Sequence, residues 1–579
     1  MIRQEIKKII EKAVRELQKE GVFPNFQIPE IAVESVDDRI GKLLYGDYSS
    51  TIAIRIRKDV GKNPIDIADK IKTKIECWNL KLSGKIKVEK PGFINFWVNQ
   101  KELEKSYSEY LKRGVKLFQE KPKKQETIVI EYSSPNIAKP LGIHHLRSTI
   151  IGQALVNILR FIGHKVISLS FPGDFGTQFG LLIAAYKRWG DREKLKKNPI
   201  PEMLDLYVRF SQAAKEDPKL LEDGRREFKK LEQGDIDNKK LWKWFSDESL
   251  RDFDRVYKLL DVKIENTIGE SFYEPELKSL IHDALKRGIA EKGEGGAIVI
   301  KIPGSDTPEI IQKADGATIY TTRELAAIRH RIKKWQATKI LYAAANQQTF
   351  HLVQVFGAAQ RLGIAKIEQL GHVKFGMMLG PGGKKFATRE GRLIPMEEVL
   401  REAVLRARKI IEELNSSLTE SEKEKIAEEV GIGAVKFFDL SHNRLSDIIF
   451  EWDKILNLKG FASPYIQYTY ARLASILRKA DFKNKKGCFN ITHPLERKII
   501  LMVLGFGEIL QEIGKTYFPS QLAEYVYKLS NDLNAFYEAL PILKAEGKER
   551  ESRLNLIFGA KEILKTGLNL LGISAPEKM

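Results

Sequence analysis

One segment in the first third of the chain restricts the possible folds more than any other. An apolar stretch from Ile128 to Tyr132 is followed by a loop with two prolines, and a helical pattern then runs from about His145 to Ile162. Gly163 stops that helix, and a second apolar stretch runs from Val166 to Phe171. Strand, helix and strand in this order predict a βαβ unit, and therefore a parallel sheet with ligands at the carboxyl ends of its strands.

Patterns on either side of this unit divide the chain into three predicted domains. Residues 1–120 combine an amphipathic helix, a strand-like stretch from Thr51 to Arg57 and the strand-like IKVEKPGFINFWV, which together predict a small α+β domain. The lysine-rich KPKKQE has the composition of a linker and opens the predicted sheet domain, 121–454. Residues 455–579 have helical spacing throughout, so we expect an all-α domain there.

Further patterns lie within the predicted sheet domain. Strand candidates run from Ala297 to Ile302 and from Lys339 to Ala343, and each precedes a helical segment, as in an α/β domain. Between them and the first unit, residues from about 185 to 290 are charged and helical in pattern. We expect this stretch to be a helical insertion.

The charge of the chain favours polyanionic partners. It carries 97 Lys and Arg against 77 Asp and Glu, a formal net charge of +20. A net positive charge attracts nucleic acid and anionic lipid alike. A proteome in which most soluble proteins are basic is an alternative explanation. Charge alone does not choose between them.

Cysteine usage and the absence of long apolar runs predict a cytoplasmic protein. Cys77 and Cys488 lack the spacing of a zinc site or a disulfide framework, which favours a reducing compartment. The N-terminal helical pattern is interrupted by lysines and glutamates, unlike a signal peptide. No apolar run approaches the roughly 18 residues that span a bilayer, so we expect no membrane association.

The loop EYSSPNIAKPLGIHHLRST, residues 131–149, lies where the first strand meets the first helix. A helix N-terminus at this position offers unpaired N–H groups and a partial positive charge, which suit the phosphates of a nucleotide. Lys139, His144 and His145 lie in the loop. The alternative is that both histidines are polar residues satisfied at a helix start.

Strings along nearly the whole chain, in order, resemble one enzyme family. They are SSPNIAKP, HLRSTIIG, GHKVISLSFPGDFGTQFG, DGATIYTTRELA, ANQQTFHLVQVF, FGMMLGPGGKKFATREG, VGIGAVKFFDLSHNR, YIQYTYARLASILRKA and LLGISAPEKM. The family is that of the arginyl-tRNA synthetases, class I enzymes. The resemblance implies a Rossmann-type catalytic domain, an N-terminal domain that binds the tRNA D-loop and a helical anticodon-binding domain. It also implies ATP-dependent activation of L-arginine and its transfer to the 3′ end of tRNA(Arg).

The resemblance assigns the arginine substrate to five residues. They are Glu131, Asn136, Tyr320, Glu324 and Gln348. A guanidinium has five donors and no acceptor, so carboxylate and amide oxygens suit its recognition. Glu324 departs from the family, which usually has Asp there, and Glu131 could instead be a strand-end carboxylate that faces solvent.

The resemblance also implies an ATP site, with one departure. The family signature resembles His-x-Gly-His, whereas this chain reads Gly142-Ile143-His144-His145, so the first histidine and the glycine are exchanged. Our hypothesis is that His144 and His145 donate to phosphate oxygens during transfer. Gly173 and Asp174 match further ATP-binding positions.

Basic residues resemble the second ATP element of class I enzymes. Lys385 to Arg389 matches Lys-Met-Ser-Lys-Ser loosely, Lys384 precedes it, and Lys139 takes the place of a lysine thought to compensate for the missing one. Together they could stabilise the charge on the α-phosphate. GPGGKK could equally be an exposed basic turn. Mg²⁺ is expected with ATP, and no carboxylate cluster marks a metal site held by the protein.

Contacts with tRNA are implied at both ends of the chain. Tyr465, Tyr468 and Arg472 share one helix face suited to stacking on anticodon bases, although aromatic residues at this spacing often form a core. Met579 matches another contact, and Phe93 and Asn95 fall where the family touches the D-loop. Phe93 could equally be packed inside. We expect a monomer.

Two other functions compete with this hypothesis. A catalytically inactive tRNA-binding paralogue would explain the exchanged signature. A class I synthetase for another amino acid does not fit the pair Glu131 and Asn136 or the string GDFGTQFG.

Overall fold

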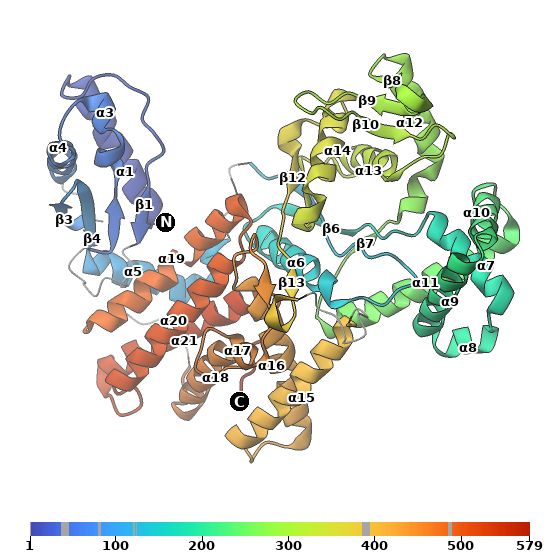
Figure 1. Ribbon diagram of the computed structural model, residues 1–579. Helices are drawn as coiled ribbons and strands as arrows, with labels where there is room; N and C mark the ends of the chain where they lie inside the picture. Colours follow the sequence, from blue (N-terminus) through green and yellow to red (C-terminus); the bar gives the residue numbers. More distant parts are fainter. Residues whose placement is uncertain are drawn as a thin grey trace.

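The structure is a computed structural model, and it describes residues 2–35, 46–78, 83–119, 122, 124–384, 394–483 and 489–579. A central sheet domain lies between an N-terminal domain on one side and a group of helices that projects on the other, with the C-terminal helices packed beneath (Figure 1). In the described part of the chain, no helix is both long and apolar enough to cross a membrane.

The N-terminal domain is a four-stranded antiparallel sheet with helices against it. The strands have the order β1-β2-β4-β3 and are β1 (Val33–Ser35), β2 (Tyr48–Ser50), β3 (Ser83–Glu89) and β4 (Phe93–Val98). The helices are α1 (Ile2–Lys19), α2 (Ile52–Arg55), α3 (Arg57–Val60) and α4 (Pro64–Glu76). The strand prediction for IKVEKPGFINFWV is confirmed as the hairpin of β3 and β4.

The prediction of a strand from Thr51 to Arg57 is wrong, because this stretch forms α2 and the start of α3. Its isoleucines alternate as in a strand, but the fully buried residues are Ile52, Ala53 and Ile56. A strand would place Ile52, Ile54 and Ile56 on one face and Ala53 on the other, whereas here Ala53 is buried with Ile52 and Ile56 and Ile54 is only half-buried, as on a helix. Packing of that face into the core therefore decides against the strand.

Helix α5 (Gln100–Arg113) joins the two ends of the chain. The hydroxyl of Tyr107 donates to the carbonyl of Leu556 at 2.9 Å, and that of Tyr110 donates to the carbonyl of Gly559 at 2.8 Å. Both acceptors belong to α21 (Gly547–Leu570). The N-terminal domain is thus anchored to the C-terminal helices.

The central domain contains a five-stranded parallel sheet of order β12-β11-β5-β6-β7. The strands are β5 (Thr127–Glu131), β6 (Lys165–Ser170), β7 (Asn266–Thr267), β11 (Lys339–Tyr342) and β12 (Leu370–His372). Helix α6 (Leu146–Phe161) connects β5 to β6, and α13 (Tyr320–Trp335) and α14 (Thr349–Arg361) follow later. The predicted βαβ unit and the α/β fold class are confirmed.

A helical block stands between β6 and β7. It consists of α7 (Thr177–Trp189), α8 (Arg192–Lys197), α9 (Pro199–Glu216), α10 (Lys219–Glu232) and α11 (Ile236–Leu259), and it forms the projecting group in Figure 1. The chain then returns to the sheet at β7 before η5 (Glu270–Tyr273) and α12 (Glu274–Lys286). The region predicted as an insertion, about 185–290, therefore contains one strand of the main sheet.

The strand candidate from Ala297 to Ile302 lies outside the parallel sheet, which corrects its assignment to a strand–helix unit. It forms β9 (Ile298–Ile300), between β8 (Ala290–Lys292) and β10 (Glu309–Gln312) in a separate antiparallel sheet. Short connections let adjacent strands pair antiparallel, whereas a parallel pair needs a long crossover.

Helices dominate the remainder. They are α15 (Met396–Leu414), α16 (Glu420–Leu440), α17 (Trp452–Ile455), α18 (Ser463–Lys479), α19 (Pro494–Thr516), α20 (Ser520–Ala539) and α21. Two short strands, β13 (Met378–Leu379) and β14 (Ile448–Ile449), pair in parallel beside the main sheet. The helical fold expected for the C-terminal region is confirmed; the domain boundaries at 120 and 454 stay a prediction.

Candidate functional site

The loop after β5 is fastened tightly to its neighbours. Ser133 has a φ of 50°, and its N–H donates to Ser148 Oγ at 2.9 Å while its hydroxyl bonds Thr149 Oγ1 at 2.7 Å. Ala138, with a φ of 63°, donates its N–H to Ser249 Oγ on α11 at 2.9 Å. These bonds hold an unusual backbone path in place at the carboxyl end of the sheet.

Gly142 and His144 are in direct contact in the exchanged signature. A Cβ on residue 142 would lie 2.6 Å from the Cε1 atom of His144, so that imidazole covers the space above the glycine. The ring of His144 also lies 3.9 Å, centroid to centroid, from that of His145. The exchange thus places a histidine ring where a side chain at 142 would otherwise stand.

His145 is a neutral imidazole at physiological pH. Burial lowers its pKa to about 3, with the charge of His144 acting in the same direction. A neutral ring carries one N–H and can still donate one hydrogen bond. The expected pair of phosphate donors is therefore one exposed ring, His144, and one less accessible neutral ring.

The loop with the first ATP signature contacts the described residues on either side of 385–393. The N–H of Ile143 donates to the carbonyl of Ile394 at 3.0 Å, and the N–H of Met396 donates to the carbonyl of Leu141 at 2.8 Å. Arg147, at the first turn of α6, donates to the carbonyl of Gly376 at 2.7 Å. The start of α6 thus touches the chain on both sides of the basic loop.

The predicted basic residues are only partly described. Lys139 lies with its ammonium 5.0 Å from the ring of Tyr207, on α9 of the helical block. Lys384 is exposed and follows Gly382 and Gly383, both at a φ of 73°. Lys385 and Arg389 lie outside the described residues.

Two of the predicted arginine-binding carboxylates are buried together. Glu131 ends β5 and is 8% exposed, and Glu324 on α13 is 1% exposed. Burial raises the pKa of Glu324 to about 8, and the charge of Glu131 adds to the increase. Burial also raises the pKa of Glu131, while Arg331 opposes the change. The prediction that Glu131 could face solvent is excluded.

A third carboxylate, Glu270 of η5, joins these two. Burial raises its pKa to about 7 against the opposing charge of Arg323. Arg323 Nη1 lies 3.7 Å from Glu270 Oε2, and its Nε donates to Glu274 Oε1 at 2.7 Å. The charges of these three buried carboxyl groups act on one another, and we name the group Glu131, Glu270 and Glu324 the acidic pocket.

Asn136 and Gly173 meet beside the acidic pocket. They form an isolated parallel bridge, and a Cβ on Gly173 would lie 2.2 Å from Asn136 Oδ1. Glycine is therefore required for this close approach. Asp174 accepts from the N–H and the hydroxyl of Ser271, at 2.8 and 2.7 Å, so its carboxylate fixes the loop that carries Glu270.

Tyr320 and Gln348 are the two remaining residues of the predicted arginine site. Tyr320 begins α13, is 44% exposed and stacks on His351 with centroids 4.8 Å apart. Gln348 is exposed in η7 (Asn346–Gln348), just before α14. Desolvation raises the pKa of Tyr320, and the charges of Glu324, Glu131 and Glu270 act in the same direction, which places its hydroxyl beside the acidic pocket.

The predicted tRNA-binding face of α18 carries three adjoining side chains. The guanidinium of Arg472 lies 4.8 Å from the ring of Tyr468 and 5.2 Å from that of Tyr537. Asn534 bonds both Tyr465 and Arg472. Its Nδ2 donates to Tyr465 Oη and its Oδ1 accepts from Arg472 Nη1, each at 2.9 Å. All three predicted residues are half-buried, so the face is neither pure core nor fully exposed.

The other predicted tRNA contacts differ in exposure. Asn95 is 2% exposed and accepts from Ser49 Oγ at 2.7 Å, which places it inside the N-terminal sheet. Phe93 is half-buried at the start of β4. The carbonyl of Met579 accepts from Asn415 Nδ2 at 3.5 Å, and its side chain packs on the core.

Comparison with known proteins identifies the family. The description "tRNA synthetases class I (R), catalytic domain" matches residues 107–452, "Arginyl tRNA synthetase N terminal domain" matches 2–98, and "DALR anticodon binding domain" matches 466–579. An arginine–tRNA ligase of Fusobacterium nucleatum is 37% identical over 570 residues, which cover 97% of each chain. The chain belongs to the arginyl-tRNA synthetase family.

Other arginyl-tRNA synthetases agree with this assignment. An arginine–tRNA ligase of Streptococcus pneumoniae is 41% identical over 458 residues, covering 79% of this chain and 81% of that protein. The crystal structure of the Plasmodium falciparum enzyme has a TM-score of 0.85 at 26% identity and covers 100% of this chain and 99% of its own. These comparisons give no support to the alternative of an inactive paralogue.

Several residues of this arginyl-tRNA synthetase site were not singled out from its sequence. They are Glu270, Arg323, Arg331, Asn534 and Tyr537. Helical spacing could have revealed Arg331, because it lies on the same face of α13 as Tyr320 and Glu324. No local signal connects the other four to the residues they contact.

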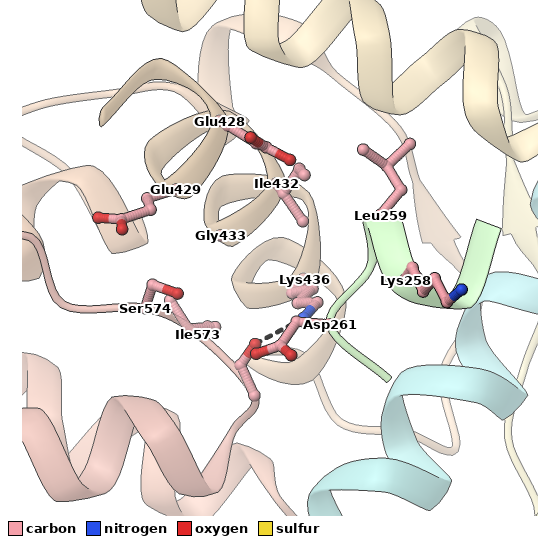
Figure 2. A pocket seen from close by; sticks show the side chains of 11 residues that line it. Lys258, Leu259, Asp261, Glu428, Glu429, Ile432, Gly433, Lys436, Ile573 and Ser574 are labelled. Carbon is pink, nitrogen blue, oxygen red and sulfur yellow. Dashed lines mark hydrogen bonds between the residues drawn. The ribbon is translucent and has the colours of Figure 1, made fainter. Parts of the chain in front are cut away.

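A separate cavity of about 170 Å³ lies between α11, α16 and the C-terminal residues. Figure 2 shows the side chains of Lys436 and Asp261 directed toward each other in it. Lys436 is 2% exposed and donates to the carbonyl of Gly572 at 2.5 Å. Burial lowers its pKa to about 8. The cavity is lined by none of the predicted site residues.

Proposed function

We propose that this arginine–tRNA ligase activates L-arginine in the acidic pocket and transfers it to the 3′ end of tRNA(Arg). Family membership implies arginine, ATP and tRNA as substrates. The observation that supports the site best is the burial of Glu131 and Glu324 together at the carboxyl end of a parallel sheet. A buried carboxyl group stays ionised only when a cation balances it, and the guanidinium of arginine is such a cation.

Glu324 provides the strongest argument for where the guanidinium binds. Its Oε2 is buried and has no hydrogen-bond partner in the described part of the chain. The N–H donors of a planar guanidinium would hydrogen-bond that oxygen and remove the desolvation penalty of a buried acceptor without a partner. Asn136, Tyr320 and Gln348 complete the proposed arginine site.

ATP would lie over the start of α6. His144 and His145 would donate to its phosphate oxygens, Gly142, Gly173 and Asp174 would shape the site, and Lys139, Lys384, Lys385 and Arg389 would supply positive charge. Mg²⁺ would arrive with the nucleotide. Among the described residues no three His, Cys, Asp or Glu side chains are grouped to hold a metal ion.

The proposed chemistry has two steps and needs no side-chain nucleophile. A carboxylate oxygen of arginine attacks the α-phosphorus of ATP, the bond to the bridging oxygen breaks, and pyrophosphate leaves with its electron pair. A hydroxyl of the terminal ribose of tRNA then attacks the carbonyl carbon of arginyl-adenylate, and AMP leaves. The protein holds the reactants in line and stabilises the charge on phosphate.

The remaining interactions concern the whole protein. The face of Tyr465, Tyr468 and Arg472 would stack on anticodon bases, Met579 would contribute nearby, and Phe93 and Asn95 would serve the D-loop. We also propose, from the sequence alone, that the protein is a cytoplasmic monomer.

The experiment that tests the function compares arginine with its uncharged analogue citrulline. With tRNA(Arg), Mg²⁺ and ATP, we expect charging of tRNA by arginine and none by citrulline, which lacks the positive charge. Failure to charge tRNA with arginine would overturn the proposal. For the ATP site, full pyrophosphate exchange by both His144→Gly and His145→Ala would refute the histidine roles.

A further inference from the structure

Arg331 occupies a guanidinium site that the protein builds for itself. Its side chain is fully buried, and Nη2 lies 2.6 Å from Glu131 Oε2. Nη1 donates to the hydroxyl of Tyr342 at 2.9 Å. Its guanidinium carbon lies 5.3 Å from the ring centroid of Phe171 and 5.4 Å from that of Tyr342. Carboxylate, phenol and aromatic faces are the chemistry that recognises arginine.

This internal arginine lies in the same pocket as the proposed substrate site. Glu131 and Glu324 lie on different elements, β5 and α13, and Arg331 follows Glu324 by two helical turns on α13. The two carboxylates repel each other, and the positive charge of Arg331 acts on both. Arg331 therefore sets the net charge that an entering ligand meets.

We propose that Arg331 is a positioning residue that determines specificity: it neutralises Glu131, so that the acidic pocket presents Glu324 as the carboxylate still to be balanced by one substrate guanidinium. The inference rests on the proposed function. It adds to that function a residue, Arg331, that controls the charge of the acidic pocket without having to touch the substrate.

The neighbouring charges support this assignment of Glu131 to Arg331 and of Glu324 to the substrate. Glu270 shares Arg323 with Glu274, so it has a cation within 4 Å from the protein itself. Glu131 has Arg331. Glu324 is 1% exposed and keeps one carboxylate oxygen without a hydrogen-bond partner among the described residues. Glu324 has no cation of its own within ion-pair distance among the described residues, and one such group, ionised when a guanidinium binds beside it, matches one singly charged side chain.

Loss of Arg331 would change the protonation of the pocket. Without this cation the pKa values of both buried carboxyl groups would rise, so Glu324 would ionise less readily and Glu131 would also tend to hold a proton. A protonated carboxyl no longer balances a guanidinium. The binding of arginine would therefore weaken although every proposed substrate contact is still present.

The test uses Arg331→Ala, with Arg329→Ala as the matched control. Arg329 lies on the same helix but pairs with the partly exposed Glu276 at 2.8 Å, outside the acidic pocket. In tRNA-dependent pyrophosphate exchange we expect Arg331→Ala to raise the KM for arginine about 100-fold, as for a broken buried ion pair, with little change in the KM for ATP. The control should change neither constant.

Chemical rescue separates a charge effect from a structural one. Guanidinium chloride, below concentrations that unfold the wild type, should restore much of the arginine affinity of Arg331→Ala by entering the vacated space. Urea has the same shape without the charge and should not. An unchanged KM for arginine, or equal rescue by urea, would overturn the inference.

If Arg331→Ala does not fold, a second variant, Arg331→Lys, tests the inference. Arg331→Lys keeps the charge but loses the planar fork, and we expect its KM for arginine to rise by no more than about tenfold with an unaltered KM for ATP. A rise as large as the 100-fold expected for Arg331→Ala, in a folded variant that keeps the charge, would overturn the inference. Wild-type protein that fails to charge tRNA would overturn the proposed function instead, so the two failures are distinguishable.

Discussion

The imidazole of His144 covers Gly142, the residue with which it is exchanged in the nucleotide signature. The two positions therefore depend on each other: the histidine can turn back only because the glycine has no side chain. This contact explains how the loop accommodates a bulky residue where the family has its glycine, and it makes the pair a unit in any mutational test.

Gly142→Ala should impair the nucleotide site. Its methyl group would stand 2.6 Å from the His144 ring, which must move. We expect the KM for ATP to rise about tenfold, since displacing one positioned side chain costs on the order of 1 to 2 kcal/mol. The double exchange Gly142→His with His144→Gly should recover most of the loss, whereas equal defects in both proteins would contradict the dependence.

The affinity for arginine should increase with pH. Burial, with the charge of Glu131, raises the pKa of Glu324 to about 8, and only its ionised form balances a guanidinium. The KM for arginine should therefore fall as the pH is raised toward 8 and level off above it, by at most about tenfold per pH unit. In Glu324→Gln the KM should be high and independent of pH; a profile like that of the wild type would exclude Glu324 as the titrating group.

The same carboxyl should cost stability in the absence of arginine. Its pKa is about 8 in the folded protein against an ordinary 4.5, so between these values the folded form holds a proton that the unfolded chain releases. Stability contributed by this group is thus lost as the pH rises through that window. Thermal melting should show Glu324→Gln gaining on the wild type from pH 5 to pH 8.5, and saturating arginine should abolish the difference.

The buried pair of Arg147 and Asp439 should matter more than an exposed one. Arg147 Nε lies 3.0 Å from Asp439 Oδ2, with side chains 1% and 0% exposed. Asp439→Asn leaves a buried guanidinium uncompensated and should lower the free energy of unfolding by about 3 to 5 kcal/mol. Glu397→Gln breaks a half-exposed pair with Arg255 and should cost less than about 1 kcal/mol. Comparable losses in urea unfolding would contradict this.

The stacked face of α18 should affect tRNA alone. Arg472→Ala removes the guanidinium between Tyr468 and Tyr537, and we expect the KM for tRNA(Arg) to rise about tenfold or more, since a stacked base contributes on the order of 1 to 3 kcal/mol. The KM values for arginine and ATP should stay unchanged. A rise in the KM for arginine would indicate a general defect.

How far the sequence predicts the fold depends on the range of the signal. The βαβ unit from β5 to β6 was predictable because its apolar runs, helix stop and loop are local. The strand prediction for Thr51 to Arg57 was wrong because the alternation of isoleucines cannot reveal that Ala53, and not Ile54, is buried with Ile52 and Ile56. The strand at 298–300 was found, but the sheet to which it belongs depends on partners, β8 and β10, that periodicity does not identify.

The same limit applies to the site. Glu131 and Glu324 were both predicted through the family resemblance, because the end of a strand alone could equally carry a carboxylate that faces solvent. Glu270 comes from a different segment, and only the fold places it near Glu131. The contact between Gly142 and His144 depends on a side-chain rotation, which no sequence pattern specifies.

The buried ammonium of Lys436 depends on the last residues of the chain for a hydrogen-bond acceptor. It donates to the carbonyl of Gly572, and Asp439 lies one turn further along the same helix, paired with the first turn of α6. Shortening the chain before Gly572 would remove more than a surface extension. It would leave a cation inside the protein with one acceptor fewer, in the helix that also supports the nucleotide loop.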